Sequence, residues 1–221
     1  MQKFDTTAPI AAVLQIPAGR VQLIAADRTD TTVDIRPANP GKNRDVRAAE
    51  KTTVSFSEGV LRIQAAEAAN QLFGPSGSVE VTVQLPTGSR VEAETASCEL
   101  RVVGRLGDLD FAGAYRQIKI DEAAHVRLTA IDGDVEIGRL TGPAEITTPR
   151  GDIRIAEAGA GAVVLRTQSG SISVTAAPGV SATLDADTGY GRISNSLKND
   201  GTPTLAIRAT TSHGDITARS L

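Results

Sequence analysis

Apolar and polar residues alternate along most of this chain, and in its second half the alternation recurs with a fixed period. A Gly-Asp or Gly-Ser pair precedes each of several aliphatic segments, whose first apolar residues are Val135, Ile153 and Ile172. These residues are 18 and 19 positions apart, a spacing typical of repeat architectures. A second alternating segment lies between successive pairs, so each repeat contains two strands. The intervening segments are 126–130, 144–148, 163–167 and 205–209.

Strict alternation is typical of a strand with one buried face. We therefore expect Ile153 to point into the core and Arg154 to point outward. The same reasoning places Leu128 inside and Arg127 outside. Glycine adopts positive φ without steric cost, and Asp or Ser bonds to nearby backbone, so the Gly-Asp and Gly-Ser pairs predict tight turns.

Two all-β architectures fit these strands. In a single-stranded β-helix-like solenoid with rungs of about 18 residues, equivalent strands stack in parallel; in an antiparallel meander, Ser169-Gly170 and its equivalents would be hairpin turns. The inward positions hold small and medium aliphatic residues, and aromatic residues make up 3% of the chain. Because such side chains stack well in a narrow coil, whereas a two-sheet sandwich usually contains larger ones, we favour the solenoid.

The first part of the chain lacks the regular period. Its strand-like segments are unevenly spaced and are joined by ordinary turns such as Glu58-Gly59. Residues 43–51 form the one plausible helix, because they have a polar start and good helix formers. The end rung of a solenoid exposes a row of backbone groups and needs a cap. We therefore predict two continuous regions, an irregular N-terminal β region and cap over 1–95 and β-solenoid repeats over 96–221.

The composition restricts the classes of partner. With 221 residues, of which 40% are hydrophobic, the chain can bury a core without a metal ion or a disulfide. The formal net charge is −3, and charges of both signs alternate along the strand exteriors. Because no basic face is present for a phosphate backbone, we expect no nucleic-acid partner.

The sequence also bears on location. No stretch approaches the length of a membrane span, and Met1–Thr7 lacks the apolar segment of a signal peptide. We therefore expect a cytoplasmic protein, with a surface location left open if the sequence has been trimmed. Cys98 is the single cysteine and cannot form an intramolecular disulfide, which is consistent with that compartment.

Several Gly-Asp pairs raise the question of calcium binding. Calcium-binding β-rolls use Gly-rich nonapeptides whose aspartates supply six or more oxygen ligands to each ion. Here each repeat supplies one such carboxylate, and Ser171 and Arg192 replace it in two repeats. We therefore interpret these aspartates as turn residues and expect no metal site. They are Asp108, Asp134, Asp152 and Asp215.

Other candidate motifs have structural explanations as well. Arg150-Gly151-Asp152 spells an integrin-binding tripeptide, but it is in register with the other turns, so the repeat explains it. His125 and His213 have no second His or Cys at ligand spacing. Cys98, His125 and an acid such as Glu99 could be drawn as a catalytic set, yet nothing supplies an oxyanion hole or a cleft. We interpret Cys98 as a turn residue and His125 as a surface residue, and expect no catalytic residues and no cofactor.

The chain is similar to a bacterial "putative adhesin" family of unknown function with β-strand repeats, also called the toastrack domain. The resemblance implies a single-stranded β-helix-like fold, no known catalytic residues, and roles in envelope stress systems or surface attachment. This chain departs from the family pattern at 97–99 and 115–117, where the family would have Ser-Gly-Asp. The residues that carry the resemblance are the strand 79–86 with Gly88 and Val91, the segment Arg105–Asp108, and the units 132–137, 150–155, 169–174 and 213–217.

These observations predict a non-enzymatic scaffold or interaction protein whose partner is another protein or, in a homodimer, a second copy. Candidate contact surfaces are the flat walls, the C-terminal rung that ends at 216–221, and the loop residues Leu72 and Phe73. The two loop residues either pack under their own Gly-Pro loop or form an exposed anchor. The polar segment 198–203 could cover the C-terminal rung.

Two alternatives stay open. The chain could bind an envelope component, a peptide or a polysaccharide along a solenoid wall. An enzyme is the third class, because other β-helices carry carboxylate sets that act on sugars. Tyr115 and Tyr190 are the only tyrosines, too few for a convincing carbohydrate platform.

Overall fold

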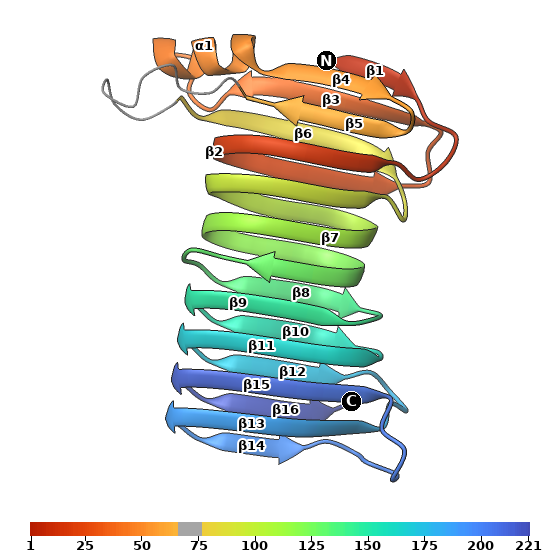
Figure 1. Cartoon of the computed structure of the whole chain (residues 1–221), viewed down its shortest axis with the longest axis vertical. Helices are drawn as coiled ribbons and strands as arrows, with labels where there is room; N and C mark the ends of the chain where they lie inside the picture. Colours follow the sequence, from red (N-terminus) through yellow and green to blue (C-terminus); the bar gives the residue numbers. More distant parts are fainter. Residues whose placement is uncertain (66–76) are drawn as a thin grey trace.

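The computed structural model describes residues 1–65 and 77–221. Within these residues the chain is predominantly β and contains one short helix (Figure 1). The elements are β1 (Gln2–Asp5), β2 (Ala11–Ala26), β3 (Asp30–Pro37), α1 (Asn43–Lys51), β4 (Thr53–Ser57), β5 (Val60–Gln64), β6 (Val79–Pro86), β7 (Arg90–Thr129), β8 (Val135–Leu140), β9 (Ala144–Arg150), β10 (Ile153–Ala158), β11 (Gly161–Ser169), β12 (Ile172–Ala176), β13 (Ala182–Tyr190), β14 (Ile193–Ser196), β15 (Leu205–His213) and β16 (Ile216–Ser220).

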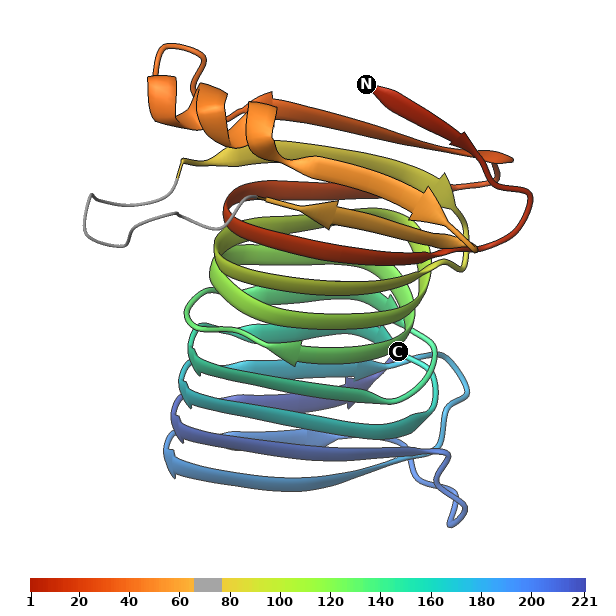
Figure 2. The ribbon, with the colours of Figure 1, turned by 45° about the horizontal axis from the view of Figure 1, so that its top comes forward.

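Most strands pair in parallel along two ladders, which form two walls joined by turns (Figure 2). Wall A runs from β5 through the first part of β2 to β7, β9, β11, β15 and β13. Wall B runs from β6 through the second part of β2 to β7, β8, β10, β12, β16 and β14. We call one strand from each wall, with the turn between them, a rung. Because this pairing is parallel, the Gly-Asp pairs lie at a corner between the walls and not in antiparallel hairpins.

The rungs follow a different order in space than in the sequence at one end of the stack. β15 pairs with β11 on one edge and with β13 on the other, and β16 likewise lies between β12 and β14. The last rung of the sequence therefore lies inside the stack, and β13 and β14 form its end (Figure 1). The expectation that the rung ending at 216–221 is the end rung of the stack is wrong.

The inward side chains explain this order. In the inserted rung, Leu205 and Ile216 are 0% and 1% exposed. In contrast, β14 places Asn195 in register with the buried Ala218, and the Asn195 Oδ1 accepts a hydrogen bond from the Leu197 N–H at 3.0 Å. A polar inward side chain costs least at an end that water can reach, so the more apolar rung is covered on both sides.

The other end of the stack is covered. β3 pairs antiparallel with β6, β1 with β3, and β4 with β5, and α1 packs beside β3 and β6 (Figure 2). The bounds of α1 confirm the helix predicted over 43–51. Asp45 of this helix is 4% exposed, and its Oδ1 accepts a hydrogen bond from the Ser78 N–H at 3.0 Å. This bond fastens the helix to the segment that leads into β6.

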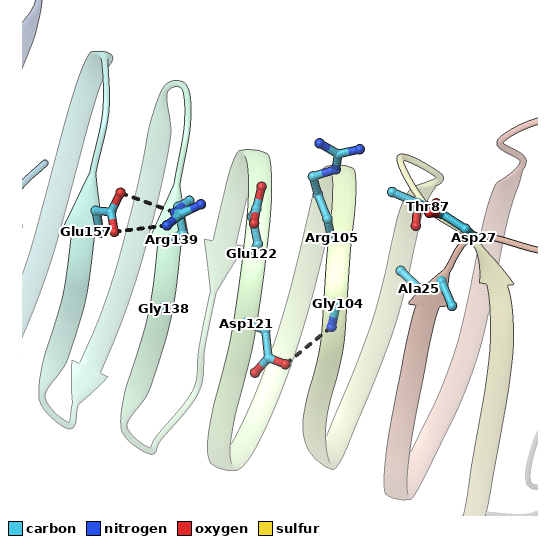
Figure 3. A pocket seen from close by; sticks show the side chains of 11 residues that line it. Ala25, Asp27, Thr87, Gly104, Arg105, Asp121, Glu122, Gly138, Arg139 and Glu157 are labelled. Carbon is cyan, nitrogen blue, oxygen red and sulfur yellow. Dashed lines mark hydrogen bonds and ion pairs between the residues drawn. The ribbon is translucent and has the colours of Figure 1, made fainter.

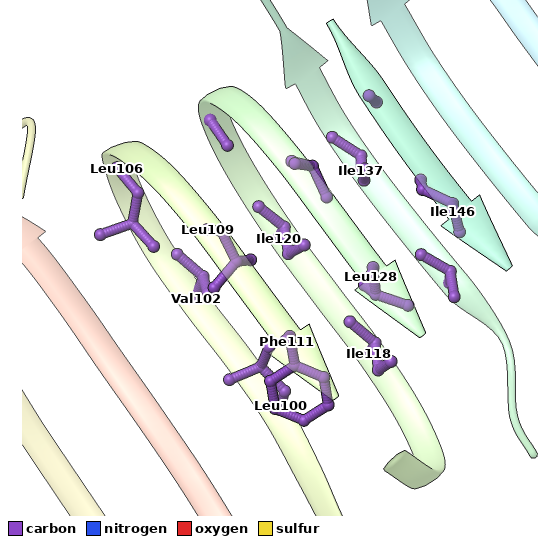
Figure 4. Packing of buried hydrophobic residues seen from close by; sticks show 14 of the residues in the cluster. Leu100, Val102, Leu106, Leu109, Phe111, Ile118, Ile120, Leu128, Ile137 and Ile146 are labelled. Carbon is purple, nitrogen blue, oxygen red and sulfur yellow. The ribbon is translucent and has the colours of Figure 1, made fainter. Parts of the chain in front are cut away.

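The core lies between the walls as columns of stacked aliphatic side chains (Figure 4). On wall B, Ile118, Ile153 and Ile172 belong to one column, and each is at most 1% exposed. Arg154 is exposed, so the predicted inward and outward directions of this strand are confirmed. Burial of each large aliphatic side chain contributes about 1.5–3 kcal/mol, which holds successive rungs together.

Candidate functional site

The Gly-Asp pairs form a column of turns along one corner of the stack. Asp134 Oδ1 accepts a hydrogen bond from the Asp152 N–H at 2.9 Å, and Asp152 Oδ1 accepts one from the Ser171 N–H at 2.7 Å. Asp215 Oδ1 accepts one from the Arg192 N–H at 2.8 Å. Each of these side chains therefore holds the turn of the next rung, which confirms that these three aspartates are turn residues.

Asp108 does not belong to this column. It lies within β7, its side chain is exposed, and the preceding Gly107 N–H donates to the Ser89 carbonyl at 3.0 Å, as in a strand ladder. Its grouping with the turn aspartates is therefore wrong.

The tripeptide Arg150-Gly151-Asp152 occupies one of these turns. Arg150 Nη2 lies 3.0 Å from Asp132 Oδ2, and the Asp152 N–H donates to Asp134. A Cβ at Gly151 would lie 2.2 Å from the Gly133 carbonyl oxygen, so no other residue fits. The structural demands of the repeat account for all three residues.

The turn column ends at the rung formed by β13 and β14. Arg192 stands there in place of the Asp or Ser of the other rungs, and no further rung follows among the described residues. An Asp or Ser side chain at this position would find no backbone N–H of a further rung to accept a hydrogen bond from. Together with the inward Asn195, the exchange to Arg192 is the sequence signal that marks the end rung.

The end rung exposes two large apolar side chains. Tyr190 is 75% exposed and Ile193 is 48% exposed. Leu184 and Ala186 face the core but are only partly buried. The Tyr190 ring stacks on the His213 ring with centroids 5.1 Å apart and an interplanar angle of 12°, which leaves its other face to solvent. The sequence pattern alone does not mark any of these residues as site residues.

The backbone of β13 has one free edge. The Ser181 carbonyl accepts a hydrogen bond from the Leu205 N–H at 3.2 Å, whereas the next N–H, that of Ala182, donates at 2.9 Å to the loop after β14. Successive residues of a strand direct their N–H and C=O to alternate sides, so Leu184 and Ala186 direct theirs away from β15. Among the described strands, β13 pairs with β15 alone. These backbone groups are therefore available to a further strand.

Outward charges pair between neighbouring rungs. On wall A, Arg166 Nη1 lies 3.3 Å from Glu145 Oε1, and Arg208 Nε lies 3.0 Å from Asp185 Oδ2. Asp187 is exposed on the same strand as Asp185, and no cation of the described residues pairs with it. The end rung therefore presents an acidic strand. Equivalent pairs on wall B are Lys119–Glu136 at 3.1 Å and Arg139–Glu157 at 3.2 Å.

A groove of about 670 Å³ crosses the other corner of the stack (Figure 3). The residues that line it include Gly104, Gly138, Arg105 and Glu122. Asp121 Oδ2 accepts a hydrogen bond from the Gly104 N–H at 3.3 Å. The lining carries charges of both signs and no aromatic side chain.

The structure does not assemble the Cys-His-acid set. Cys98 is 0% exposed within β7, where its Sγ–H donates to the Ile16 carbonyl at 3.3 Å, so its interpretation as a turn residue is wrong. Burial raises the pKa of the Cys98 thiol to about 12, which keeps it protonated. Cys98 lies in register with Gly19 at the start of wall B, whereas the exposed His125 precedes Val126 at the start of wall A.

Leu72 and Phe73, the predicted anchor, lie outside the described residues. Across 1–65 and 77–221, no group of three or more His, Cys, Asp or Glu side chains is placed to hold a metal ion. No helix in that part of the chain has the length and apolar character needed to cross a membrane.

Fold and surface together define a β-rich repeat protein with one covered end and one open end. The chain belongs to the family described as Toastrack DUF4097, whose profile matches residues 14–220. The function of this family is unknown. The match confirms the resemblance that the strand and turn motifs indicated.

Solved structures with some similarity come from bacteria. One is a "putative adhesin" from Bacteroides fragilis, with a TM-score of 0.48, 14% identity, and coverage of 98% of this chain and 95% of that one. Another is a "putative lipid binding protein" from Parabacteroides distasonis, with a TM-score of 0.44, 12% identity and coverage of 98% and 95%. A third is a "putative cell adhesion protein" from Clostridium sporogenes, with a TM-score of 0.43, 11% identity and coverage of 100% and 98%. No curated protein matches the chain.

Proposed function

We propose that this chain is a non-enzymatic β-solenoid scaffold that binds another protein chain, either a partner or a second copy, at the open end formed by β13 and β14. The observation that carries the proposal is the difference between the two ends. One end carries the antiparallel strands β1, β3 and β4 and the helix α1, whereas the other exposes the side chains of Tyr190 and Ile193 beside the free edge of β13. Exposed apolar side chains beside unpaired strand backbone are typical of protein interaction sites.

The state of the candidate nucleophile supports a non-enzymatic role. A thiol acts as a nucleophile in its thiolate form, and the raised pKa of the buried Cys98 disfavours that form. The nearest candidate base in the sequence, His125, begins the other wall. The resemblance to the family adds the proposal that the contact serves an envelope stress or surface function.

Site-specific photo-crosslinking in the native cell tests this function. A photoreactive amino acid in place of Tyr190 should give a discrete crosslinked product, because this position lies at the open end. The matched control is the same amino acid at Glu92, which is exposed on wall A in a part of β7 that already pairs with β2. Equal crosslinking from both positions, or crosslinking from Glu92 alone, would contradict the proposal.

Sedimentation of the purified chain distinguishes the two kinds of partner. If a second copy occupies the end, the mass doubles with concentration, and Tyr190→Ser with Ile193→Ser abolishes the doubling. If the partner is another protein, the purified chain sediments as a monomer while the crosslink from Tyr190 forms in the cell.

A second candidate function is binding of an envelope component, a peptide or a polysaccharide at the polar groove. The favouring observation is the volume of about 670 Å³ together with the mixed charges of Arg105 and Glu122. A fragment of such a ligand should shift the backbone amide signals of Gly104 and Gly138 in NMR spectra. Shifts confined to Leu184 and Ala186 would instead favour the open end.

A further inference from the structure

Two columns of outward residues on wall A end at acidic residues of β13. One column of wall A contains Arg127, Glu145, Val164, Arg208 and Asp185 in register. Where two charges are neighbours in this column they are opposite in sign, and the last two form an ion pair at 3.0 Å. Opposite charges on adjacent strands stabilise the pairing, whereas like charges destabilise it. The next strand of the column would therefore carry a cation opposite Asp185.

The neighbouring column of wall A also favours a cation on the added strand. It contains Arg166, Thr210 and Asp187 in register, and Asp187 has no ion-pair partner within the described residues. Asp185 and Asp187 lie two positions apart, so both project from the same face of β13. A strand added to this edge would meet two carboxylates with the spacing of alternate residues.

The inward face of β13 favours apolar residues on an added strand. Leu184 and Ala186 continue the core columns of Ile207 and Ala209, which are 2% and 1% exposed, yet they themselves are only partly buried. A further strand with small apolar residues between its cations would bury them. At the end of the strand, the open face of Tyr190 suits a cation, because an aromatic ring attracts a positive charge over its face.

A second copy of this chain fits the edge poorly. Two-fold pairing of β13 with its own copy is antiparallel, and when it is centred on Ala186 it sets Asp185 and Asp187 of one chain against the same carboxylates of the other. β4, which pairs with β5 alone among the described strands, has the outward residues Thr53, Ser55 and Ser57 and no cation. The chain therefore does not itself supply the complement of β13 on this strand.

We propose that the free edge of β13 binds an extended segment of another protein by strand addition, with Lys or Arg opposite Asp185 and Asp187 and small apolar residues between them. The main-chain groups of Leu184 and Ala186 supply the hydrogen bonds, and the two carboxylates supply the specificity. This inference rests on the proposed function, because it assigns a partner chemistry to the same open end.

A synthetic peptide tests the inference directly. The probe is a fluorescein-labelled peptide of 9 residues, the length of β13, with alternating lysine and valine; its counterpart has glutamate in place of lysine. Fluorescence anisotropy should show that the parent protein binds the lysine peptide and not the glutamate peptide. The double variant Asp185→Lys/Asp187→Lys should bind the lysine peptide about tenfold more weakly or worse, and should gain binding of the glutamate peptide.

Two further variants separate strand addition from general attraction of charge. Glu92→Lys/Glu94→Lys makes the same change in net charge at two exposed, alternately spaced acids of wall A, but on a strand already paired with β2, so it should bind the lysine peptide as the parent does. Ala186→Pro removes an N–H from the open edge, where proline is tolerated, and should abolish binding of both peptides while the far-UV circular dichroism stays that of the parent.

The outcomes distinguish failure of this inference from failure of the proposed function on which it rests. Lysine-peptide binding that Asp185→Lys/Asp187→Lys or Ala186→Pro leaves unchanged overturns the inference, as does equal weakening by Glu92→Lys/Glu94→Lys. A different result would assign the edge to a second copy: the parent protein dimerises and binds neither peptide, and Ala186→Pro dissociates the dimer. That result would overturn the inference and keep the proposed function. A monomer without peptide binding and without a crosslink from Tyr190 would overturn both.

Discussion

Substitution of Gly214 by alanine tests how closely the turns of neighbouring rungs approach each other. A Cβ at this position would lie 2.1 Å from the Gly170 carbonyl oxygen, and Gly214 has φ of +149°. The same oxygen accepts a hydrogen bond from Thr211 Oγ1 at 2.9 Å, and the Gly214 N–H donates to the Tyr190 carbonyl at 2.9 Å. Because both neighbouring backbones are held in ladders, relief of the contact must weaken these bonds.

The magnitude follows from the two causes of destabilisation. Positive φ costs an alanine about 1–2 kcal/mol, of which roughly 0.4–1 kcal/mol is offset by reduced entropy of the unfolded chain. Each weakened hydrogen bond adds about 1 kcal/mol. Gly214→Ala should therefore lower the free energy of unfolding by about 3 kcal/mol. Gly201→Ala is the matched control, because Gly201 also has positive φ, +98°, but has nothing within 4 Å of its Cβ position; it should cost about 1 kcal/mol.

Urea unfolding followed by far-UV circular dichroism measures the difference, since the chain has no tryptophan to report by fluorescence. For a chain of this size, 3 kcal/mol corresponds to a melting temperature lower by about 6–12 °C. If Gly214→Ala and Gly201→Ala unfold at the same urea concentration, the turn of Gly214 does not lie against that of Gly170, and the reasoning fails.

Three further predictions concern the core and the rung. Cys98 should resist a thiol reagent at pH 8 and react once urea unfolds the chain, because its pKa is raised to about 12 in the folded state; rapid labelling of folded protein would contradict its burial. Ile153→Asp should abolish soluble expression, whereas Arg154→Asp should change stability by less than about 1 kcal/mol; equal effects would refute the assigned facing. Deletion of 127–144, one repeat of 18 residues, should leave a folded, shorter protein by thermal melting, whereas deletion of 127–135 should not; two equally poor melts would show that the rung is wrongly assigned.

The local features of the fold could be predicted from the sequence because they depend on neighbours along the chain. Alternation fixes which side chains face the core, as Ile153 and Arg154 show. The polar start and helix formers of 43–51 were sufficient to locate α1. At Cys98 the break in the Gly-Asp pattern predicts a turn, whereas the inward alternation that Cys98 shares with Leu100, which is 1% exposed, predicts the buried position that the structure shows.

The order of the rungs and the candidate site could not be predicted in the same way. Every Gly-Asp turn offers the same hydrogen-bonding groups, so any of these turns can lie next to any other. The Asp215 side chain therefore accepts a hydrogen bond from the Arg192 N–H, although β15 and β16 follow β14 in the sequence. Which rung ends the stack is decided by the relative cost of exposing each inward face, a comparison between segments far apart in the chain. The site at Tyr190 follows from that order, so local sequence patterns do not reveal it either.

The position of β13 and β14 at the open end is the central claim, and disulfide trapping tests it most directly. Ser173, Thr217 and Ser194 lie in register on three neighbouring strands, with Thr217 in the middle. Introduced cysteine pairs at Ser173 with Thr217, and at Thr217 with Ser194, should each oxidise to an intramolecular disulfide, since adjacent strands lie about 4.8 Å apart. The pair at Ser173 with Ser194 spans two strand spacings and should stay reduced. A disulfide between Ser173→Cys and Ser194→Cys, with none from Thr217→Cys to Ser173→Cys, would place the last rung of the sequence at the end and contradict the account.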